Sequence, residues 1–462
     1  MTLAWGRIYE LETNYYHPAL LSGFAKRYPN YPNKEQLAED IRISKLELYP
    51  FLDSTSSLNS YGYTNEHGEW VIPPRRNFEE PSFFNQGYAV IGHNGLYGVV
   101  DKKGVEIVPF IYDEIELLEN SLILVSLNGL YGLLNRDGSQ RHKIEYNQII
   151  DVDSLFYLLY KGDNSELYCI KNTAALNFDP MDLELLGRGY YRAYGFKGMK
   201  VGLFEANDTC MLSEVLPIVY GEINQFDDDE FVGELGNGMK IMNTSNEMLT
   251  DSIYESISPL HNGYALAMKE SGVGYLNSHA EEVIDFQYEP FMGIMSSGLF
   301  HEGYAIVKSD GRFGVIDTSG NYKLTPEYEQ MIYLGGMYGL RQEDHWSIIS
   351  LAKDSITPAL FTSIDALGDG FVLFKENGKY GMMDADMNSI FPPVYRSIKR
   401  FKNHFVIVGC GDDLNYITDR YGNLSSTKGF SSAQPLTKTH LLVKYENKTG
   451  YFRLTDGKLI LQ

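Results

Sequence analysis

Short apolar runs alternate with polar, glycine-bearing turns along most of this chain. Three segments open in the same way, at Gly87-Tyr88-Ala89, Gly263-Tyr264-Ala265 and Gly303-Tyr304-Ala305, and each continues into an apolar run. Short apolar runs that are bounded by turn residues and contain β-branched and aromatic side chains are typical of β-strands. The pattern therefore predicts many short strands joined by tight turns.

A tight hairpin is predicted after each of these apolar runs. Asn-Gly or Asp-Gly between two apolar runs favours a two-residue type I′ turn, because both central residues of that turn need a positive φ. Such pairs occur at Asn94-Gly95, Asn128-Gly129, Asn237-Gly238, Asp310-Gly311 and Asn377-Gly378.

The remainder of the unit predicts a second turn and a third strand. An aromatic-glycine step follows the hairpin, and then come an apolar pair and a polar turn that begins with Asp101, Asp317 or Asp384. Asp accepts hydrogen bonds from the backbone ahead of it, so we expect these residues to cap turns and not to form a catalytic set. A proline-to-tyrosine stretch such as Pro109–Tyr112 closes the unit. One unit is thus an antiparallel meander of about three strands, which must stack on neighbours to bury its faces.

The units recur at a regular interval. The glycine of the aromatic-glycine step, or its equivalent, lies at Gly62, Gly98, Gly132, Gly202, Gly274, Gly314, Gly381 and Gly450. Most intervals are one or two multiples of about 35 residues, which is the mark of a tandem repeat. Degenerate copies fill the gaps near Tyr168, Lys240, Trp346-Ser347 and Tyr416, which gives about twelve units across residues 58–462. The tyrosine that closes the unit recurs and is expected in the core, at Tyr112, Tyr220, Tyr288, Tyr328 and Tyr395.

This unit resembles that of the bacterial WG-repeat family, which has the form GxAxVxxNGKWGxIDxxGxxVIPxxYDxIxxF. Residues Gly303 to Tyr328, Gly87 to Ile115 and Gly370 to Tyr395 follow that pattern closely. The family's tryptophan is mostly tyrosine or phenylalanine here, and Trp346 is followed by Ser347 in place of glycine. The resemblance implies a module that binds other proteins and has no shared catalytic residues.

The predicted fold is all-β, a tandem array of antiparallel meanders. We favour an elongated, twisted stack, with propeller-like closed rings as the alternative. Residues 1–57 do not repeat and predict a small helical cap or a docking segment. Pro18 opens a helix that runs to Arg27, and a capping box at Asn33-Lys34-Glu35-Gln36 opens a second helix that runs to about Leu48.

The net charge and the cysteine content narrow the range of expected partners and compartments. The formal net charge of −22 disfavours nucleic acids and anionic membranes as partners. Cys169, Cys210 and Cys410 lie far apart and lack metal-ligand spacing, so we expect free thiols in a reducing compartment. No secretory signal or membrane-length apolar run is recognised, and we expect a cytoplasmic protein.

Sequence motifs indicate no enzyme. The acidic run Phe226–Phe231 lacks the spacing of a calcium loop and is expected to be a solvated loop, and Cys410 is expected to lie in a hairpin slot without a reactive role. The ten histidines share no repeat position or metal motif. We therefore expect no catalytic residues, no metal and no cofactor.

The sequence supports a binding function best. The leading hypothesis is a non-catalytic protein that binds another protein, as a scaffold or as a neutraliser of a bacterial effector. The alternatives are a glycan-binding protein or carbohydrate-active enzyme, and a self-assembling structural component. Tyrosine is a good contact residue, and four tyrosines outside the repeats are the candidate binding residues: Tyr15, Tyr16, Tyr28 and Tyr31.

Overall fold

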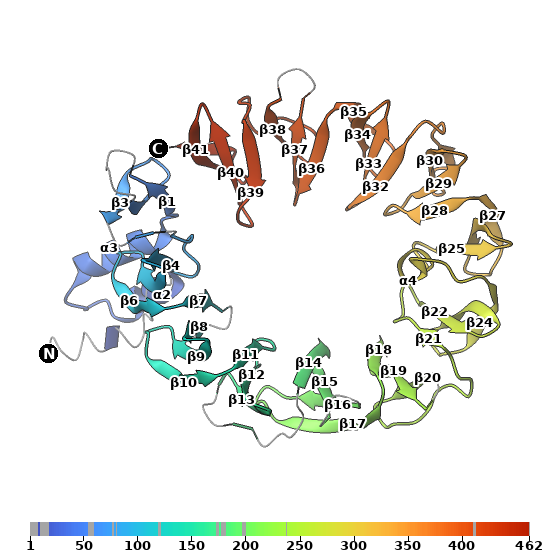
Figure 1. Ribbon diagram of the computed structural model, residues 1–462, viewed down its shortest axis with the longest axis horizontal. Helices are drawn as coiled ribbons and strands as arrows, with labels where there is room; N and C mark the ends of the chain where they lie inside the picture. The colour runs from blue at the N-terminus through green and yellow to red at the C-terminus, as the bar shows by residue number, and fades with distance from the viewer. Residues whose placement is uncertain are drawn as a thin grey trace. The chain divides into compact units, whose positions relative to one another are not determined.

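In the computed structural model the chain is built of small β-sheets that follow one another along the sequence (Figure 1). The structure describes residues 8–9, 18–53, 60–75, 78–79, 81–118, 122–171, 175–176, 182–195, 200–236, 238–409 and 413–461. Two compact units are distinguished: Met1–Leu185 with Ala206–Leu212 and Gln462, and Leu186–Glu205 with Ser213–Leu461.

The described strands form twelve antiparallel sheets of three or four strands each, and none of these sheets closes into a barrel. The first four sheets are β1 (Tyr49–Leu52), β2 (Tyr61–Thr64), β3 (Trp70–Arg75); β4 (Tyr88–His93), β5 (Leu96–Asp101), β6 (Glu106–Tyr112); β7 (Glu114–Leu117), β8 (Leu122–Leu127), β9 (Leu130–Asn135), β10 (Gln140–Tyr146); and β11 (Gln148–Asp151), β12 (Phe156–Lys161), β13 (Asn164–Cys169).

The next four sheets are β14 (Asp182–Gly187), β15 (Tyr190–Tyr194), β16 (Val201–Ala206), β17 (Leu212–Tyr220); β18 (Ile223–Asp227), β19 (Glu230–Leu235), β20 (Gly238–Asn243); β21 (Ser256–Ile257), β22 (Tyr264–Lys269), β23 (Gly272–Asn277), β24 (Glu282–Tyr288); and β25 (Tyr304–Ser309), β26 (Arg312–Asp317), β27 (Tyr322–Tyr328). The last four are β28 (Gln330–Tyr333), β29 (Tyr338–Gln342), β30 (His345–Ser350), β31 (Ser355–Ile356); β32 (Ser363–Gly368), β33 (Phe371–Glu376), β34 (Lys379–Met383), β35 (Ser389–Tyr395); β36 (Ser397–Phe401), β37 (His404–Val408), β38 (Asn415–Asp419); and β39 (Ser432–Pro435), β40 (His440–Tyr445), β41 (Lys448–Arg453), β42 (Lys458–Leu461).

The repeat prediction is confirmed. The twelve sheets match the expected number of units, and the four degenerate copies each contain a sheet, namely β11 to β13, β18 to β20, β28 to β31 and β36 to β38. The choice between an open stack and closed rings stays a prediction.

The predicted hairpins have type I′ geometry. Asn94 and Gly95 have φ values of 52° and 79°, and Asp310 and Gly311 have 49° and 76°. The turn fixes the register of the two strands it joins, so Tyr97 lies opposite Gly92, and Phe313 lies opposite Lys308. Asn237 of another predicted pair lies outside the described residues.

The glycine of the aromatic-glycine step allows the third strand to cross closely over the second. A Cβ atom on Gly314 would lie 2.6 Å from the backbone oxygen of Leu324 and 3.0 Å from the nitrogen of Pro326. The register of β26 and β27 shifts at this point, between the Phe313–Tyr328 and Val315–Leu324 pairs. A bulge brings the third strand against the second, and only a residue without a side chain fits beneath it.

The aspartates at the second turn cap it, as predicted. Asp384 Oδ1 accepts hydrogen bonds from the backbone N–H groups of Asp386 and Asn388, at 2.9 and 2.8 Å. Asp317 makes the same pair of bonds to Ser319 and Asn321, and these backbone groups hold the pKa of Asp317 below its usual value. These aspartates recur because each occupies the same turn of its own repeat, and this structural role accounts for them without a common catalytic one.

A second recurring cap links the connector to the hairpin that follows it in four repeats. Asp113 Oδ2 accepts a hydrogen bond of 2.5 Å from the backbone N–H of Asn128, at the tip of the β8–β9 hairpin. Equivalent bonds hold three other hairpins, from Asn94 to Glu79, from Gly162 to Asn147 and from Gly311 to Glu289. The aspartate of the family's "YD" step is thus a structural cap.

The core lies between neighbouring sheets, as stacking requires. One cluster joins Val99, Val108 and Tyr112 of the second sheet to Ile123 and Val125 of the third. The recurring tyrosine is buried at Tyr112, Tyr220 and Tyr288, and is half-buried at Tyr328 and Tyr395. Aromatic burial of this kind supplies the stabilisation that a single three-stranded sheet lacks.

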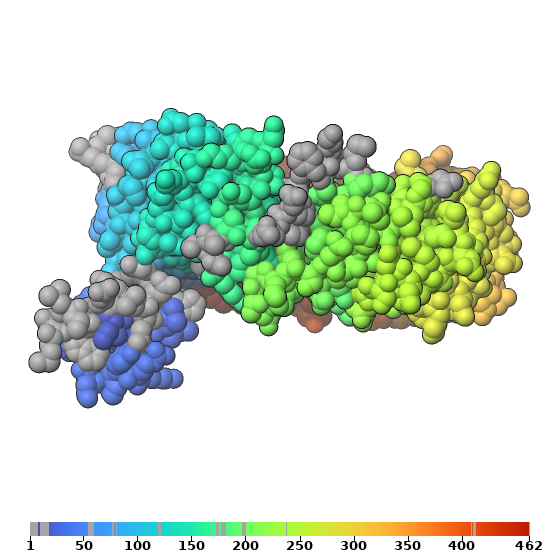
Figure 2. All heavy atoms as spheres, turned by 90° about the horizontal axis from the view of Figure 1, so that it is seen from below, coloured from blue at the N-terminus to red at the C-terminus, as the bar shows by residue number. Residues whose placement is uncertain are grey.

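The N-terminal helices are α2 (Pro18–Arg27) and α3 (Lys34–Lys45), and in Figure 2 they form the blue segment against the first sheets. Lys102 Nζ donates to the backbone oxygens of Ser44 and Leu46 at the end of α3. Lys103 forms an ion pair with Asp40, whose side chain is 1% exposed. The helices are therefore fastened to the sheet that contains β5.

Several details of the fold differ from the sequence prediction, most of them in this segment. The capping box is wrong, because Asn33 makes no side-chain cap, and α3 ends at Lys45, where Leu46 turns extended. Strand β1 lies within residues 1–57 and pairs with β2, so the first sheet begins before the predicted boundary at residue 58. A short helix, α4 (Ile294–Ser297), was also not foreseen.

The cysteine prediction is wrong for two of the three residues. Cys169 at the end of β13 and Cys210 form a disulfide, with their Cα atoms 5.9 Å apart. Both side chains are buried, and Cys210 lies in a turn with a φ of 62°, where other repeats have glycine. The sequence separation of 41 residues concealed a pairing that the fold makes possible. Cys410 lies outside the described residues.

Candidate functional site

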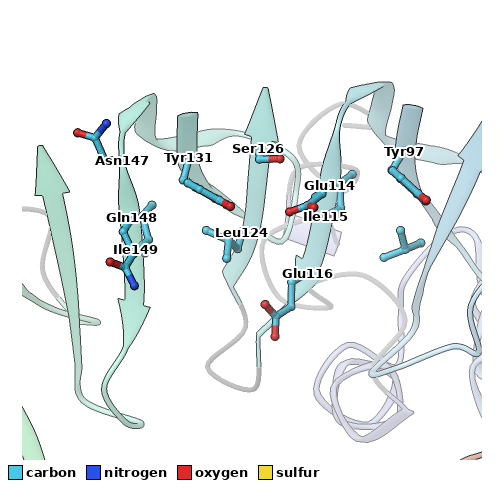
Figure 3. Close-up of a pocket in the computed structure, with 11 residues that line it drawn as sticks. Tyr97, Glu114, Ile115, Glu116, Leu124, Ser126, Tyr131, Asn147, Gln148 and Ile149 are labelled. Atoms are coloured by element: carbon cyan, nitrogen blue, oxygen red, sulfur yellow. The ribbon is translucent and has the colours of Figure 1, made fainter. Parts of the chain in front are cut away.

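A groove crosses two successive repeats of the first unit. It has a volume of about 740 Å³, and Figure 3 shows its side chains along neighbouring strands from β5 to β11. Its lining residues are Val90, Tyr97, Glu114, Ile115, Glu116, Leu124, Ser126, Tyr131, Asn147, Gln148 and Ile149.

The groove consists of two equivalent halves. Each half has an apolar residue from the first hairpin strand, the tyrosine of the tyrosine-glycine step, and a polar-apolar pair from the connector strand. The first half has Val90, Tyr97, Glu114 and Ile115, and the second has Leu124, Tyr131, Gln148 and Ile149. The repeat therefore builds the same small pocket twice, side by side.

Strand alternation explains this lining. Val90 is half-buried between the buried Ala89 and Ile91, so it faces the groove while they face the core. Tyr97 and Tyr131 are half-buried. The glycine that follows each of them lies beneath the third strand, on the opposite face of its own strand. Half-buried aromatic rings beside an apolar floor offer contact area at a low cost in side-chain entropy.

The rim of the groove is acidic. Glu114 and Glu116 are exposed and lie two residues apart on β7, and the described lining residues include no Lys, Arg or His. Both carboxylates project from one face of one strand, about 7 Å apart by strand geometry.

A second cavity, in the other unit, is different in character. It has a volume of about 650 Å³, and its arginine, Arg312, is paired within the chain, at 3.5 Å from Glu329. Its remaining lining residues are Glu327, Gln342, Glu343, His345 and Ala359. The acidic groove of the first unit is the better candidate for a ligand.

Of the four tyrosines suggested by the sequence, the two that the structure describes, Tyr28 and Tyr31, do not line this groove. Tyr31 is 3% exposed and packs in the helical core, where its ring stacks on Tyr9 at 5.5 Å. Tyr28 is half-buried, with its ring 4.8 Å from that of Phe24. Tyr15 and Tyr16 lie outside the described residues. Tyr31 is thus a core residue and not a contact residue, and the tyrosines that line the groove belong to the repeats.

The acidic run forms a hairpin turn. Asp228 and Asp229 connect β18 to β19, while Phe226 and Phe231 on either side are buried. Asp229 accepts a hydrogen bond of 2.9 Å from the hydroxyl of Tyr190. In the described part of the chain, no group of three or more His, Cys, Asp or Glu side chains is placed to hold a metal ion.

Two histidines, the buried His142 and the half-buried His301, have a lowered pKa but belong to the packing. Burial lowers the pKa of His142, whose Nε2 lies 2.8 Å from the hydroxyl of Tyr157. Burial also lowers the pKa of His301, whose ring stacks on Tyr333 at 3.8 Å. Neither lines a cavity described above, so we assign both to the core.

Together, the recurring hairpins, the shared cores and the duplicated pocket define a tandem β-repeat protein. The family model for the WG containing repeat matches residues 61–97, 97–131, 241–271 and 380–412. The chain is a WG-repeat protein. Two of the matched segments, 61–97 and 97–131, cover much of the groove.

Other comparisons add no function. No curated protein matches the chain. A eukaryotic initiation factor is similar with 10% identity and a TM-score of 0.33, covering 84% of this chain and 96% of its own. Apo AztD from Citrobacter koseri has 12% identity and a TM-score of 0.29, covering 64% and 90%. PorZ of Porphyromonas gingivalis has 8% identity and a TM-score of 0.21, covering 90% and 79%. Similarity at this level carries no argument about this chain.

No helix in the described part of the chain has the length and apolar character that crossing a membrane requires.

Proposed function

We propose that this WG-repeat protein is a non-catalytic binding protein that holds another protein in its duplicated groove. The observation that carries the proposal is the composition of the groove. Its floor is apolar at Val90, Ile115, Leu124 and Ile149, its walls are aromatic, and its rim is polar. An apolar and aromatic centre within a polar rim is typical of surfaces that bind proteins.

The arrangement favours binding over catalysis. The groove holds two exposed carboxylates of one strand, and its described lining residues include no His, Cys or Lys to work with them. A scaffold and a neutraliser of a bacterial effector both fit this function, and a cytoplasmic location stays a prediction. The disulfide between Cys169 and Cys210 is typical of an oxidising compartment, so thiol labelling of the protein in its native cells tests the location.

A capture experiment tests the proposal. The full chain and a Tyr97→Leu/Tyr131→Leu variant are immobilised, and proteins from a lysate of the native organism are compared on both. Any protein held by the wild type alone is then purified and titrated calorimetrically against both chains. We expect stoichiometric binding to the wild type and loss of binding to the variant.

Three results would contradict the proposal. One is a purified partner that binds both chains equally. Another is a glycan array in which the wild type, but not the variant, binds sugars, which would support the glycan-binding alternative. Light scattering that reports polymers of the wild type growing with concentration, and fewer polymers of the variant, would support self-assembly.

A further inference from the structure

We infer that the groove binds an extended basic segment of a protein, whose Lys or Arg side chains lie against Tyr97 and Tyr131. The inference rests on the proposed function and specifies its ligand. It comes from comparing the groove with equivalent places in other repeats of the same chain.

In three other repeats, a cation of the chain itself lies opposite the aromatic residue of the repeat. Lys308 pairs with Phe313 across β25 and β26, and its ammonium group lies 6.0 Å from the ring centre. Lys375 pairs with Tyr380, at 5.1 Å. Arg341 lies opposite Trp346 in the same register. These three repeats thus place a cation beside their aromatic ring, where cation–π attraction favours it, whereas Leu52 and Ile407 lie opposite Tyr61 and Tyr416 in two others.

The two groove repeats lack this cation. Gly92 lies opposite Tyr97, and Ser126 lies opposite Tyr131, so neither position supplies a charge. The type I′ turn sets the same register in all of these hairpins, which makes the positions equivalent. The place that Lys308 fills elsewhere is therefore left for a group from outside the chain.

The carboxylate that accompanies Lys308 has an equivalent in a groove repeat. Glu289 pairs with the ammonium group of Lys308 at 3.1 Å, and its backbone N–H donates to the oxygen of Lys308. Asp113 stands in the same place in a groove repeat, since its backbone N–H donates to the oxygen of Ser126. The Tyr131 repeat thus has an aromatic ring in the groove and the acid of a cation site on its connector, and no Lys, Arg or His is among the described residues that line the groove.

Charge and shape favour a polypeptide as the source of that cation. Glu114 and Glu116 add negative charge to the rim, and the net charge of −22 attracts basic partners and repels nucleic acid. Two equivalent cation places lie side by side over an apolar floor. A chain with several basic residues can fill both places and also cover that floor.

Fluorescence anisotropy tests the inference. The probe is a labelled peptide of five Lys-Gly-Ser triplets, and the control probe has Gln in place of every Lys. We expect the lysine peptide to bind the full chain, and the glutamine peptide to bind at least tenfold more weakly. Tyr131→Leu should weaken binding of the lysine peptide about three- to tenfold, whereas Tyr131→Phe, which keeps the ring, should leave it unchanged.

Matched variants separate the groove from general charge effects. Ser126→Lys should put a cation of the chain itself opposite Tyr131 and so weaken binding of the lysine peptide. Ser319→Lys adds the same charge at an exposed turn of the other unit and should have little effect. Tyr380→Leu removes an equivalent ring that already has its lysine, and should leave binding unchanged. Thermal unfolding of each variant shows that it has folded.

The inference is overturned if the glutamine peptide binds as tightly as the lysine peptide, or if Tyr131→Leu and Tyr380→Leu behave alike. If the lysine peptide does not bind, yet a captured protein still distinguishes the wild type from the Tyr97→Leu/Tyr131→Leu variant, the basic ligand is wrong and the proposed function stands. If both experiments fail, the proposed function falls as well.

Discussion

Replacing Gly314 by alanine should open its repeat, because the third strand leaves no room for a side chain. The added Cβ would lie 2.6 Å from the oxygen of Leu324, 3.0 Å from the nitrogen of Pro326 and 3.1 Å from the carbonyl carbon of Thr325. All three neighbours are backbone atoms, so no side chain can rotate away. Strand β27 must move instead, at the bulge that sets its register with β26.

The size of the effect follows from this crowding. Inserting a group into packed structure costs about 1–3 kcal/mol, and the rigid neighbours place Gly314→Ala in the upper part of that range. Gly311→Ala is the matched control in the same hairpin. Gly311 has a φ of 76° and nothing within 4 Å of an added Cβ, so alanine there costs only its left-handed conformation, about 1–2 kcal/mol.

Hydrogen exchange followed by mass spectrometry measures the local opening of this repeat. A local measurement is needed because a chain of two units need not unfold in one step. Gly314→Ala should raise the exchange rates of residues 304–328 about 30- to 150-fold, which corresponds to about 2–3 kcal/mol. Gly311→Ala should raise them less, and peptides of the first unit should not change. Equal or larger effects of Gly311→Ala would refute the crowding explanation.

Three further changes test other features. Reducing the Cys169–Cys210 disulfide, or replacing both cysteines by serine, should destabilise the first unit by about 4 kcal/mol, because the unfolded chain gains the entropy of a loop that was closed over 41 residues. Urea unfolding with and without reductant measures this loss of stability, and an unchanged midpoint would contradict it. Lys103→Met removes the cation beside the buried Asp40, which keeps the hydrogen bond from the Tyr9 hydroxyl, and should weaken the docking of α2 and α3 by about 3 kcal/mol. Hydrogen exchange of residues 18–45 reports this change, and protection like that of the wild type would count against the ion pair. Burial lowers the pKa of His142 below the unfolded value of 6.5, so the folded state stays neutral while the unfolded state takes up a proton. Stability of the first unit should therefore fall as the pH drops below about 6.5, and His142→Gln should reduce that fall in urea titrations; an equal fall in the variant would exclude His142 as its source.

Much of the fold could be predicted because its determinants are local. Asn94-Gly95 and Asp310-Gly311 specify a turn through φ alone, and Asp384 caps the second turn through bonds two and four residues ahead. Features that depend on distant residues were missed. The disulfide joins residues 41 apart, and the end of α3 depends on contacts from Lys102, whose Nζ binds the oxygens of Ser44 and Leu46.

The candidate site was missed for a different reason. Tyr97 and Tyr131 occupy an ordinary repeat position, and nothing in either residue alone distinguishes it from Tyr380. The distinction lies in the residue across the hairpin, which is Gly92 or Ser126 in the groove and Lys375 in the other repeat. A two-residue turn fixes that pairing, so the signal was present in the sequence once repeats were compared position by position.

The hydrogen bond from Asn128 to Asp113 has a consequence for how such arrays lengthen and shorten. The side chain that secures a hairpin stands before it in the sequence, so a self-sufficient module begins at the connector and not at the first hairpin strand. Asp113 and Asn147 occupy the same place 34 residues apart. An array shortened so that it starts at Asp113 keeps the acceptor for the Asn128 turn, whereas one that starts at Leu122 loses it. A WG unit that stands first in an array, or is transferred by itself, should therefore begin just after the closing tyrosine of the unit before it.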